Sequence, residues 1–220
     1  MDVMKMKFGM SKDRIKLIWH DLRSEVNKFV AVEIGEVDYI LHLAASSHVD
    51  RSIEDPMAFV MDNVVGTTNI LNFARKCLIL KAFLYFSTDE VFGPAPEGIA
   101  YKEWDRYNSG NPYAAAKLYA HTMAKIYRES FKLFIVCGIL FNHESPRRGI
   151  GIVSQKVTYA AACAKLGIKN SADLNEEGEP IVRQGKVALG NLTAKRDWGF
   201  AGDYVEAMYL MMTQKKPDDF

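Results

Sequence analysis

Short apolar runs alternate with longer helical patterns along most of the chain. Four nearly continuous apolar runs predict strands, at residues 15–19, 39–45, 82–87 and 133–141. Three longer segments carry apolar side chains at helical spacing and predict helices, at residues 24–37, 57–76 and 112–128. The run at 39–45 is typical of a parallel strand buried on both faces. The alternation predicts an α/β fold, a doubly wound parallel sheet with right-handed crossovers.

The pattern changes after residue 141. Residues 142–151 are polar and rich in turn formers, and the charged stretch 169–186 contains Gly and Pro, which predicts an exposed loop. The remaining predicted elements are a helix, a short strand and a second helix, at residues 152–164, 187–189 and 204–212. These changes divide the chain into three segments, at residues 1–142, 143–194 and 195–220.

Two features of such a sheet are missing from the sequence. No GxGxxG or GxxGxxG motif is present, since Gly149 and Gly151 lie late and outside a strand–turn–helix context. The chain also ends at Phe220 without a closing element. We therefore expect a fragment that lacks the first βαβ unit and part of the C-terminal substrate domain.

Composition narrows the class of protein. The chain has 220 residues, of which 49% are hydrophobic and 25% charged, as in ordinary soluble globular proteins. Its 28 basic and 27 acidic residues give a net charge of +1, so we expect no nucleic-acid partner. No apolar run has the length of a membrane span and no signal peptide is visible, so we expect a cytoplasmic protein without membrane contact. The three cysteines and five histidines lack metal-ligand spacing, so no metal site is expected.

Tyr113 and Lys117 are the first candidates for chemistry. Four residues apart on a predicted helix, their side chains lie on one face. An ammonium group beside a phenol favours the phenolate and lowers the tyrosine pKa, which makes the tyrosine a usable base near neutral pH. Taken alone, this spacing is more often a surface lysine beside a half-buried tyrosine.

Residues 87–90, Ser-Thr-Asp-Glu, follow directly on the strand predicted at 82–87. In open parallel sheets the reacting ligand lies beyond the carboxyl ends of the strands, so a hydroxyl and two carboxylates there indicate a site. A turn or a helix cap is the alternative. That alternative explains Ser87 and Asp89 better than it explains their occurrence together with the Tyr/Lys pair.

Several motifs together resemble a known family. Four of them are similar to the extended short-chain dehydrogenase/reductase family: HLAASSHVD at 42–50, NVVGTT at 63–68, STDE at 87–90 and YAAAK at 113–117. Four more resemble its nucleotide-sugar 4,6-dehydratases, and most closely the GDP-mannose 4,6-dehydratase branch: GILFNHESPRRG at 138–149, LGNL at 189–192, KRDWG at 195–199 and DYV at 203–205. The resemblance runs from about Ile15 to the end. Asp89 departs from the branch and is similar to dTDP-glucose dehydratases, and Phe92 stands where the family often has tyrosine.

The resemblance implies the organisation of the chain and its partners. It implies an N-terminally incomplete, Rossmann-like NAD(P)-binding core at 1–142, a substrate-facing segment at 143–194, and a C-terminally incomplete return to the core at 195–220. It further implies NADP or NAD as the cofactor, a nucleotide-sugar substrate, and a homo-oligomer.

The resemblance also implies a mechanism, an internal redox elimination in which the cofactor ends as it began. Tyr113, assisted by Lys117 and Thr88, would take the proton of the sugar 4-hydroxyl while hydride leaves C4. Glu90 would then remove the C5 proton, and Asp89 would protonate the departing 6-hydroxyl.

Other roles follow from matching positions. Besides Tyr113 and Lys117, the residues implied for cofactor binding are Asp21, Leu22, Leu43, Ala44, Ala45, Ser46, Ser47, His143 and Arg148. The residues implied for substrate binding are Ser87, Asn142, Glu144, Arg147 and Arg196. A guanidinium pairs well with diphosphate oxygens, but a solvated basic turn at 147–148 and a plain Arg196–Asp197 ion pair are the alternatives.

Three functions remain open. The first is a GDP-mannose 4,6-dehydratase. The second is a dTDP-, UDP- or CDP-glucose dehydratase, or an epimerase or reductase; the latter two use the Tyr/Lys pair but have less need of Asp89 and Glu90. The third is a non-enzymatic domain retained as a subunit or regulator, which the missing phosphate loop favours and the intact Thr88/Tyr113/Lys117 set disfavours.

Overall fold

The structure is a computed structural model, and it describes residues 14–175 and 178–220. The start of the predicted cofactor core, residues 1–13, lies outside this described part. The chain divides into two units: the first runs to Ile139 and resumes at Met211–Phe220, and the second is Leu140–Leu210. The chain thus re-enters the first unit later than residue 195, where the sequence places the return.

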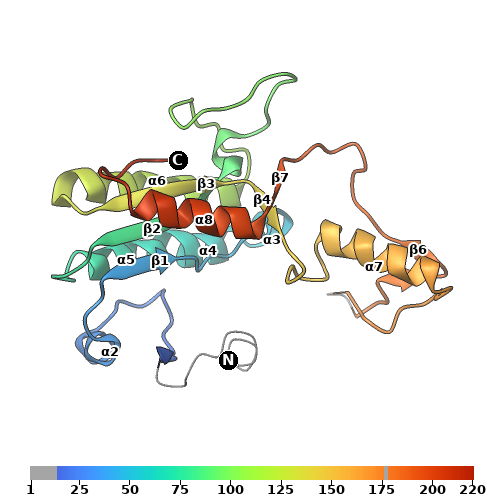
Figure 1. The fold of residues 1–220 in the computed structure, drawn as a ribbon, viewed down its shortest axis with the longest axis horizontal. Coiled ribbons are helices and arrows are strands. Elements are labelled where there is room, and N and C mark those ends of the chain that lie inside the picture. Colours follow the sequence, from blue (N-terminus) through green and yellow to red (C-terminus); the bar gives the residue numbers. More distant parts are fainter. Residues whose placement is uncertain (1–13, 176–177) are drawn as a thin grey trace. The chain divides into compact units, whose positions relative to one another are not determined.

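A three-stranded sheet with the order β1-β2-β3 organises the first unit (Figure 1). Its strands are β1 (Tyr39–His42), β2 (Ala82–Thr88) and β3 (Ile135–Leu140). β1 pairs with β2 in parallel, starting with Tyr39 opposite Ala82. Phe83 and Leu84 point to opposite faces of β2, yet their side chains are 0% and 1% exposed. Both faces of β2 are therefore covered, and the predicted parallel α/β sheet is confirmed.

Two helices, α5 (Gly66–Ala74) and α6 (Pro112–Phe131), share a buried core with the sheet. Its members come from α5, β2, α6 and β3, and are Leu71, Ala74, Phe83, Tyr85, Ala120, Ala124, Tyr127, Ile135 and Cys137. α6 begins as predicted, because the Asn111 side chain accepts a hydrogen bond from the Ala114 amide and Pro112 occupies the first turn. The core thus fixes α6 against the strand whose end carries the candidate site.

The helix predicted at 57–76 is present, but it is not uniform. It consists of α4 (Pro56–Phe59), a π-helical segment η2 (Val60–Val65) and α5. A π turn is wider than an α turn and occurs mostly as a single turn near functional sites. A 3-10 segment, η3 (Asp89–Phe92), follows β2 directly.

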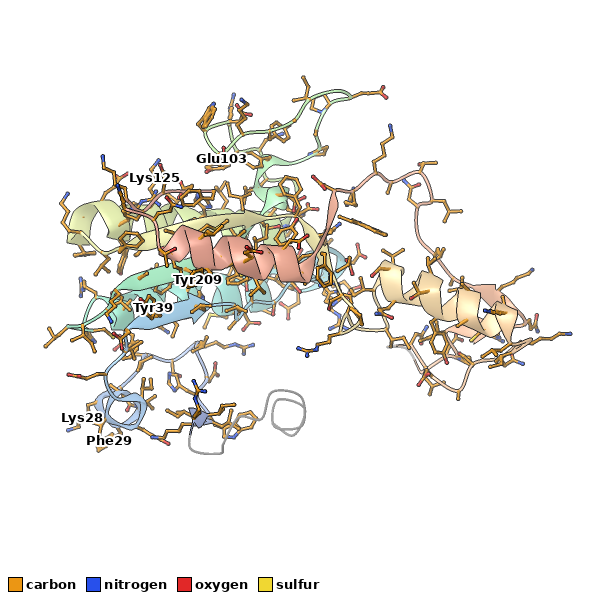
Figure 2. The ribbon with its side chains drawn as sticks, in the orientation of Figure 1. Lys28, Phe29, Tyr39, Glu103, Lys125 and Tyr209 are labelled. Atoms are coloured by element: carbon orange, nitrogen blue, oxygen red, sulfur yellow. The ribbon has the colours of Figure 1, made fainter. Side chains whose placement is uncertain are left out.

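The strand predicted at 15–19 is wrong, because no strand forms there among the described residues. A strand needs a neighbouring strand as its hydrogen-bond partner, and among the described residues β1 pairs only with β2. Without such pairing, Leu17 and Trp19 are 58% and 88% exposed. The predicted burial of both faces of β1 is also wrong. Tyr39 and Leu41 are 48% and 46% exposed, and Figure 2 shows Tyr39 on this strand.

The helix predicted at 24–37 is shorter, α2 (Lys28–Ile34). Asn27 caps it instead of Ser24, since the Asn27 side chain accepts from the amides of Phe29 and Val30. Gly35 ends it with φ 81°, a left-handed conformation that glycine adopts without strain. A short helix that the sequence did not predict, α3 (Val49–Glu54), follows the loop after β1.

Residues 218–220 run along β3 as a terminal strap. The Cys137 amide donates to the Asp218 carbonyl (3.2 Å), the Ile139 amide donates to the Phe220 carbonyl (2.7 Å), and the Phe220 amide donates to the Cys137 carbonyl (2.9 Å). The strap therefore pairs with β3 through backbone hydrogen bonds within the first unit.

The second unit contains small sheets and two helices. Its elements are β4 (Asn142–Glu144), α7 (Val153–Lys165), β5 (Val182–Arg183), β6 (Lys186–Val187), β7 (Trp198–Phe200) and most of α8 (Ala201–Met212). β4 pairs with β7 in parallel, and β5 with β6 as an antiparallel hairpin. Both helices were predicted, whereas β4 and β7 were not, and the hairpin lies where the sequence predicted a loop and a strand at 187–189. No described helix is long and apolar enough to cross a membrane.

Candidate active site

The end of β2 and the first turn of α6 bring the predicted catalytic residues together. The Thr88 side chain lies beside the Tyr113 phenol, and hydrogen bonding between them works to lower the pKa of Tyr113. Thr88 is the last residue of β2 and is 6% exposed, and Tyr113 lies in the first turn of α6 with its ring edge-on to Phe59. A phenol beside a hydroxyl can take a proton from a bound ligand.

Lys117 lies one turn further along α6 and is 4% exposed. Its ammonium group donates to the Phe86 carbonyl and lies over the Tyr85 ring, 4.5 Å from the ring centroid. Burial lowers the pKa of Lys117 to about 7. The lysine is therefore held by the strand, and its charge is partly lost at neutral pH.

The pKa of Tyr113 moves opposite to the prediction. Burial raises it, and the negative charges of Asp89 and Glu90 raise it further, while the hydrogen bond from Thr88 opposes the shift. The predicted lowering by Lys117 is not seen because the ammonium group is bonded to Phe86. Tyr113 therefore needs a further positive charge nearby before it can act as a base at neutral pH.

The two carboxylates follow Thr88 in η3. The Thr88 hydroxyl donates to Asp89 Oδ1 (3.3 Å) and accepts from the Glu90 amide (3.4 Å). Glu90 Oε2 accepts from Asn111 Nδ2 (3.2 Å), while Asn111 also caps α6. Asn111 thus links Glu90 to the turn that carries Tyr113. Asn111 is not among the site residues predicted from the sequence, although an Asn before Pro112 is a helix-start signal.

Hydrogen bonds from the π segment η2 position the loop after β1. The residues of this loop that the resemblance implies for cofactor binding are Leu43, Ala44, Ala45, Ser46 and Ser47. Asn63 is 1% exposed, and it accepts from the Ser46 amide (2.9 Å) and donates to the Ser46 carbonyl (2.9 Å). The neighbouring Asp62 accepts from the Ser46 hydroxyl (2.6 Å). Two consecutive residues therefore bind one loop residue, and Asn63 is a positioning residue that the sequence prediction left out.

We expect Asn63→Ala to lower the free energy of unfolding by about 1–3 kcal/mol, because it leaves two partly buried backbone groups of Ser46 without the Asn63 side chain. Asn69→Ala is the matched control, since Asn69 makes a single hydrogen bond, to the Leu22 carbonyl. Chemical denaturation measures both variants. An equal loss of unfolding free energy in the two variants would show that the two hydrogen bonds of Asn63 to Ser46 stabilise the fold no more than the single bond of Asn69.

The structure supports a dinucleotide site beside this loop. An open cavity of about 470 Å³ is lined by Ala45, Ser46 and Ser47 together with residues of α3 and α4. Residues 43–47 are mostly exposed, as contact with a ligand requires. Asp21, implied for cofactor binding, is exposed, and its side chain accepts from the Arg23 amide (2.9 Å), while Arg23 pairs with Asp62 (2.7 Å). These residues fit a nicotinamide dinucleotide bound along the carboxyl ends of the strands.

Six of the predicted site residues lie in the second unit. Glu144 pairs with Arg148 (3.4 Å) and accepts from the Ser154 hydroxyl (2.6 Å). His143 lies near Tyr204, with ring centroids 5.2 Å apart. Of the six, the structure thus brings Glu144 and Arg148 together, whereas Arg147 and Arg196 are exposed, and Asn142 lies on β4 opposite Trp198.

Ser87 differs from its predicted role. It is 5% exposed, and its hydroxyl lies 2.9 Å from His121 Nδ1, inside the first unit. His121, Cys137 and Asp219 place ligand-type atoms within 4.8 Å of one another. Arg128 Nη1 lies 2.9 Å from Asp219, so a metal ion there would face a guanidinium that already neutralises the carboxylate.

The chain is similar to curated GDP-mannose 4,6 dehydratases. The family model described as GDP-mannose 4,6 dehydratase matches residues 3–220. The chain belongs to this family. It is 38% identical over 216 residues to GDP-mannose 4,6 dehydratase 2 of Arabidopsis thaliana, and 40% identical over 209 residues to the GDP-mannose 4,6 dehydratase of Homo sapiens. These matches cover 96% and 94% of the chain but 53% and 52% of the relatives, so the chain spans about half their length.

Solved structures place the dehydratase-family chain in the extended short-chain dehydrogenase/reductase fold. A dTDP-glucose 4,6-dehydratase from Streptomyces venezuelae, with NAD and TYD bound, is 25% identical with a TM-score of 0.73; the match covers 91% of this chain and 56% of that one. A UDP-glucuronic acid 4-epimerase from Bacillus cereus has a TM-score of 0.75 at 19% identity, over 98% and 62%. The second likeness shows the fold alone, which dehydratases and epimerases therefore share.

Proposed function

We propose that this protein is a GDP-mannose 4,6-dehydratase, which converts GDP-mannose to the 4-keto-6-deoxy sugar with NADP. The observation that carries the proposal is the placing of Tyr113 and Lys117 in the first turns of α6, against the strand that ends at Thr88, with Asp89 and Glu90 next in the chain. The names of the relatives, at 38% and 40% identity, support the substrate. The fit of residues 43–47 to a dinucleotide, and the NAD in a similar solved structure, support the cofactor class.

The first step oxidises C4 of the sugar. Tyr113 takes the proton of the 4-hydroxyl, and Thr88 hydrogen-bonds the phenol and orients it. Bound oxidised nicotinamide would accept the hydride from C4 and bring a positive charge that favours the phenolate. Lys117 is buried, and its side-chain nitrogen donates to the Phe86 carbonyl. Because its pKa is about 7, a bound ligand can favour the protonated form.

The second step eliminates water. The 4-ketone acidifies the C5 proton, which Glu90 accepts while Asp89 donates a proton to the departing 6-hydroxyl. Hydride then returns to C6 and a proton to C5, so the net change is loss of one water. The bond from Asn111 to Glu90 fixes the direction of the carboxylate relative to α6.

The resemblance to the dehydratase family also supports a cytoplasmic location and assembly with further copies of the chain.

An assay of the complete gene product tests the function. We expect conversion of GDP-mannose at a kcat/KM at least about 10²-fold above those for dTDP-glucose, UDP-glucose and CDP-glucose, that is, about 2.7 kcal/mol of differential transition-state binding. Product is measured as the 4-keto-6-deoxy sugar nucleotide. Equal or greater turnover of any other substrate would overturn the assignment, and 4-epimer formation would favour the epimerase alternative.

Glu90→Gln separates the two steps. We expect hydride transfer from C4 to persist, while exchange of the C5 proton with solvent falls by about 10²–10⁴-fold, because an amide is no base. Deuterium incorporation at C5 measures the exchange, and nicotinamide absorbance measures the hydride step. Glu103→Gln, at an exposed glutamate (Figure 2), should change neither. Deuterium entering C5 at the normal rate in Glu90→Gln would show that Glu90 is not the base.

A further inference from the structure

A buried polar chain lies behind the candidate site. Ser87 Oγ is 2.9 Å from His121 Nδ1, and His121 Nε2 is 3.4 Å from Asp219 Oδ2 and 3.2 Å from the Tyr107 hydroxyl. His121 is 1% exposed, and the Asp219 side chain is 10% exposed. Arg128 binds the other oxygen of Asp219 at 2.9 Å. Every polar atom of the imidazole thus has a partner.

The three members of this chain come from separate parts of the sequence. Ser87 is the penultimate residue of β2, His121 lies in the middle of α6, and Asp219 belongs to the terminal strap. The strap is fixed to β3 by backbone hydrogen bonds on both sides of Cys137. The polar chain therefore links α6 to β2 and, through the strap, to β3.

The buried polar chain shares a helix face with the proposed catalytic residues. His121 follows Lys117 by four residues and Tyr113 by eight, so all three lie along one face of α6. Ser87 precedes Thr88, the hydrogen-bond partner of Tyr113. Several contacts thus join α6 to β2: His121–Ser87 in the interior, Lys117 with Tyr85 and Phe86 one turn earlier, and Tyr113 beside Thr88 in the site.

We infer that His121 is a positioning residue, which fixes Thr88 against Tyr113 by locking α6 to the end of β2, with Asp219 orienting the imidazole. The catalytic consequence rests on the proposed function, whereas the structural lock does not. With the Nε2 proton directed at Asp219, Nδ1 accepts from the Ser87 hydroxyl, and both hydrogen bonds are satisfied in the interior. Loss of the lock lets Thr88 and Tyr113 separate, and a displacement of 1 Å can cost about 10²-fold in rate.

The test compares His121→Phe, which removes the contacts with Ser87, Asp219 and Tyr107, with His121→Gln, whose amide can accept from Ser87 and donate to Asp219. Asp219→Asn provides a second route to the same loss if His121→Phe does not fold. Tyr127→Phe is the matched control, because Tyr127 lies on α6 like His121 and the change removes a single hydrogen bond, to Asn72 (2.8 Å). Thermal unfolding first establishes that each variant is folded.

The first readout needs no activity. In His121→Phe and Asp219→Asn, hydrogen exchange of the amides at 87–90 and 113–117 should rise by about tenfold or more, since these amides depend on the lock. Exchange there should be close to wild type in His121→Gln and unchanged in Tyr127→Phe. Unchanged exchange at 87–90 in folded His121→Phe or Asp219→Asn would overturn the inference.

The second readout is turnover of GDP-mannose. We expect kcat to fall by about 10–10²-fold in His121→Phe with KM within about threefold, and to recover in part in His121→Gln, because the loss lies in the placement of Tyr113. A fall in stability with kcat unchanged would reduce His121 to a structural role and overturn the inference. An inactive wild type with the expected exchange pattern would overturn the proposed function alone.

Discussion

Tyr113→Phe is expected to lower the rate of GDP-mannose conversion by about 10²–10⁴-fold while leaving NADP(H) binding nearly intact. The phenol oxygen is the group that removes the proton of the sugar 4-hydroxyl, and phenylalanine keeps the ring packed against Phe59. Single-turnover nicotinamide absorbance measures the hydride step directly, and fluorescence titration measures cofactor affinity.

The control for Tyr113→Phe lies on the same helix. Tyr119 is 43% exposed, and Tyr119→Phe should turn over at the wild-type rate. A Tyr113→Phe enzyme as fast as Tyr119→Phe would remove Tyr113 from the mechanism. A variant that instead loses cofactor binding would show that Tyr113 holds the dinucleotide and not the proton.

Lys117→Met is expected to stabilise the fold at neutral pH while abolishing activity. Burial lowers the pKa of Lys117 to about 7 in the folded chain, against about 10.4 when unfolded. Between these values the unfolded chain binds more protons, so the free energy of unfolding rises with pH, by about 2 kcal/mol between pH 7 and pH 9. Methionine has no proton to bind, so the variant should lack this rise and be the more stable protein at pH 7.

Urea denaturation at pH 7, 8 and 9 measures this slope. Lys125→Met, at an exposed lysine of the same helix (Figure 2), should keep the wild-type slope. A Lys117→Met protein with the full slope, or one less stable than wild type at pH 7, would contradict a desolvated lysine. Such a trade of stability for activity is common at functional sites.

The sequence predicted the elements whose signals are local. β2 is a continuous apolar run, and α6 begins at an Asn-Pro pair with alanines along its buried face, so both were placed correctly. The run at 15–19 is also mostly apolar, but a strand forms only where the chain pairs with a neighbouring strand, and no local pattern reports that pairing. The three-residue strands β4 and β7 depend on each other for pairing, and neither has a pattern long enough to detect.

The site was predicted at the residues that carry motifs. Thr88 and Tyr113 lie near each other because their motifs fall at the end of β2 and the start of α6, and the roles that the resemblance implied for them stay predictions. Asn63, His121 and Asp219 were not selected, since their roles arise from tertiary contacts with Ser46 and Ser87. The pKa of Tyr113 could not be predicted either, because burial and the carbonyl that binds Lys117 depend on the folded chain.

The π turn at Val60–Val65 holds one residue more than a regular α-helix needs between α4 and α5. Because a π turn accommodates one residue more than an α turn, removing one residue here would allow a regular helix from Pro56 to Ala74 with α4 and α5 in nearly the same relative rotation. The extra residue therefore sets which side chains of the turn face the loop after β1, where Asp62 and Asn63 bind Ser46. A deletion at 60–65 is thus expected to keep the helix and to lose the hydrogen bonds that position the loop.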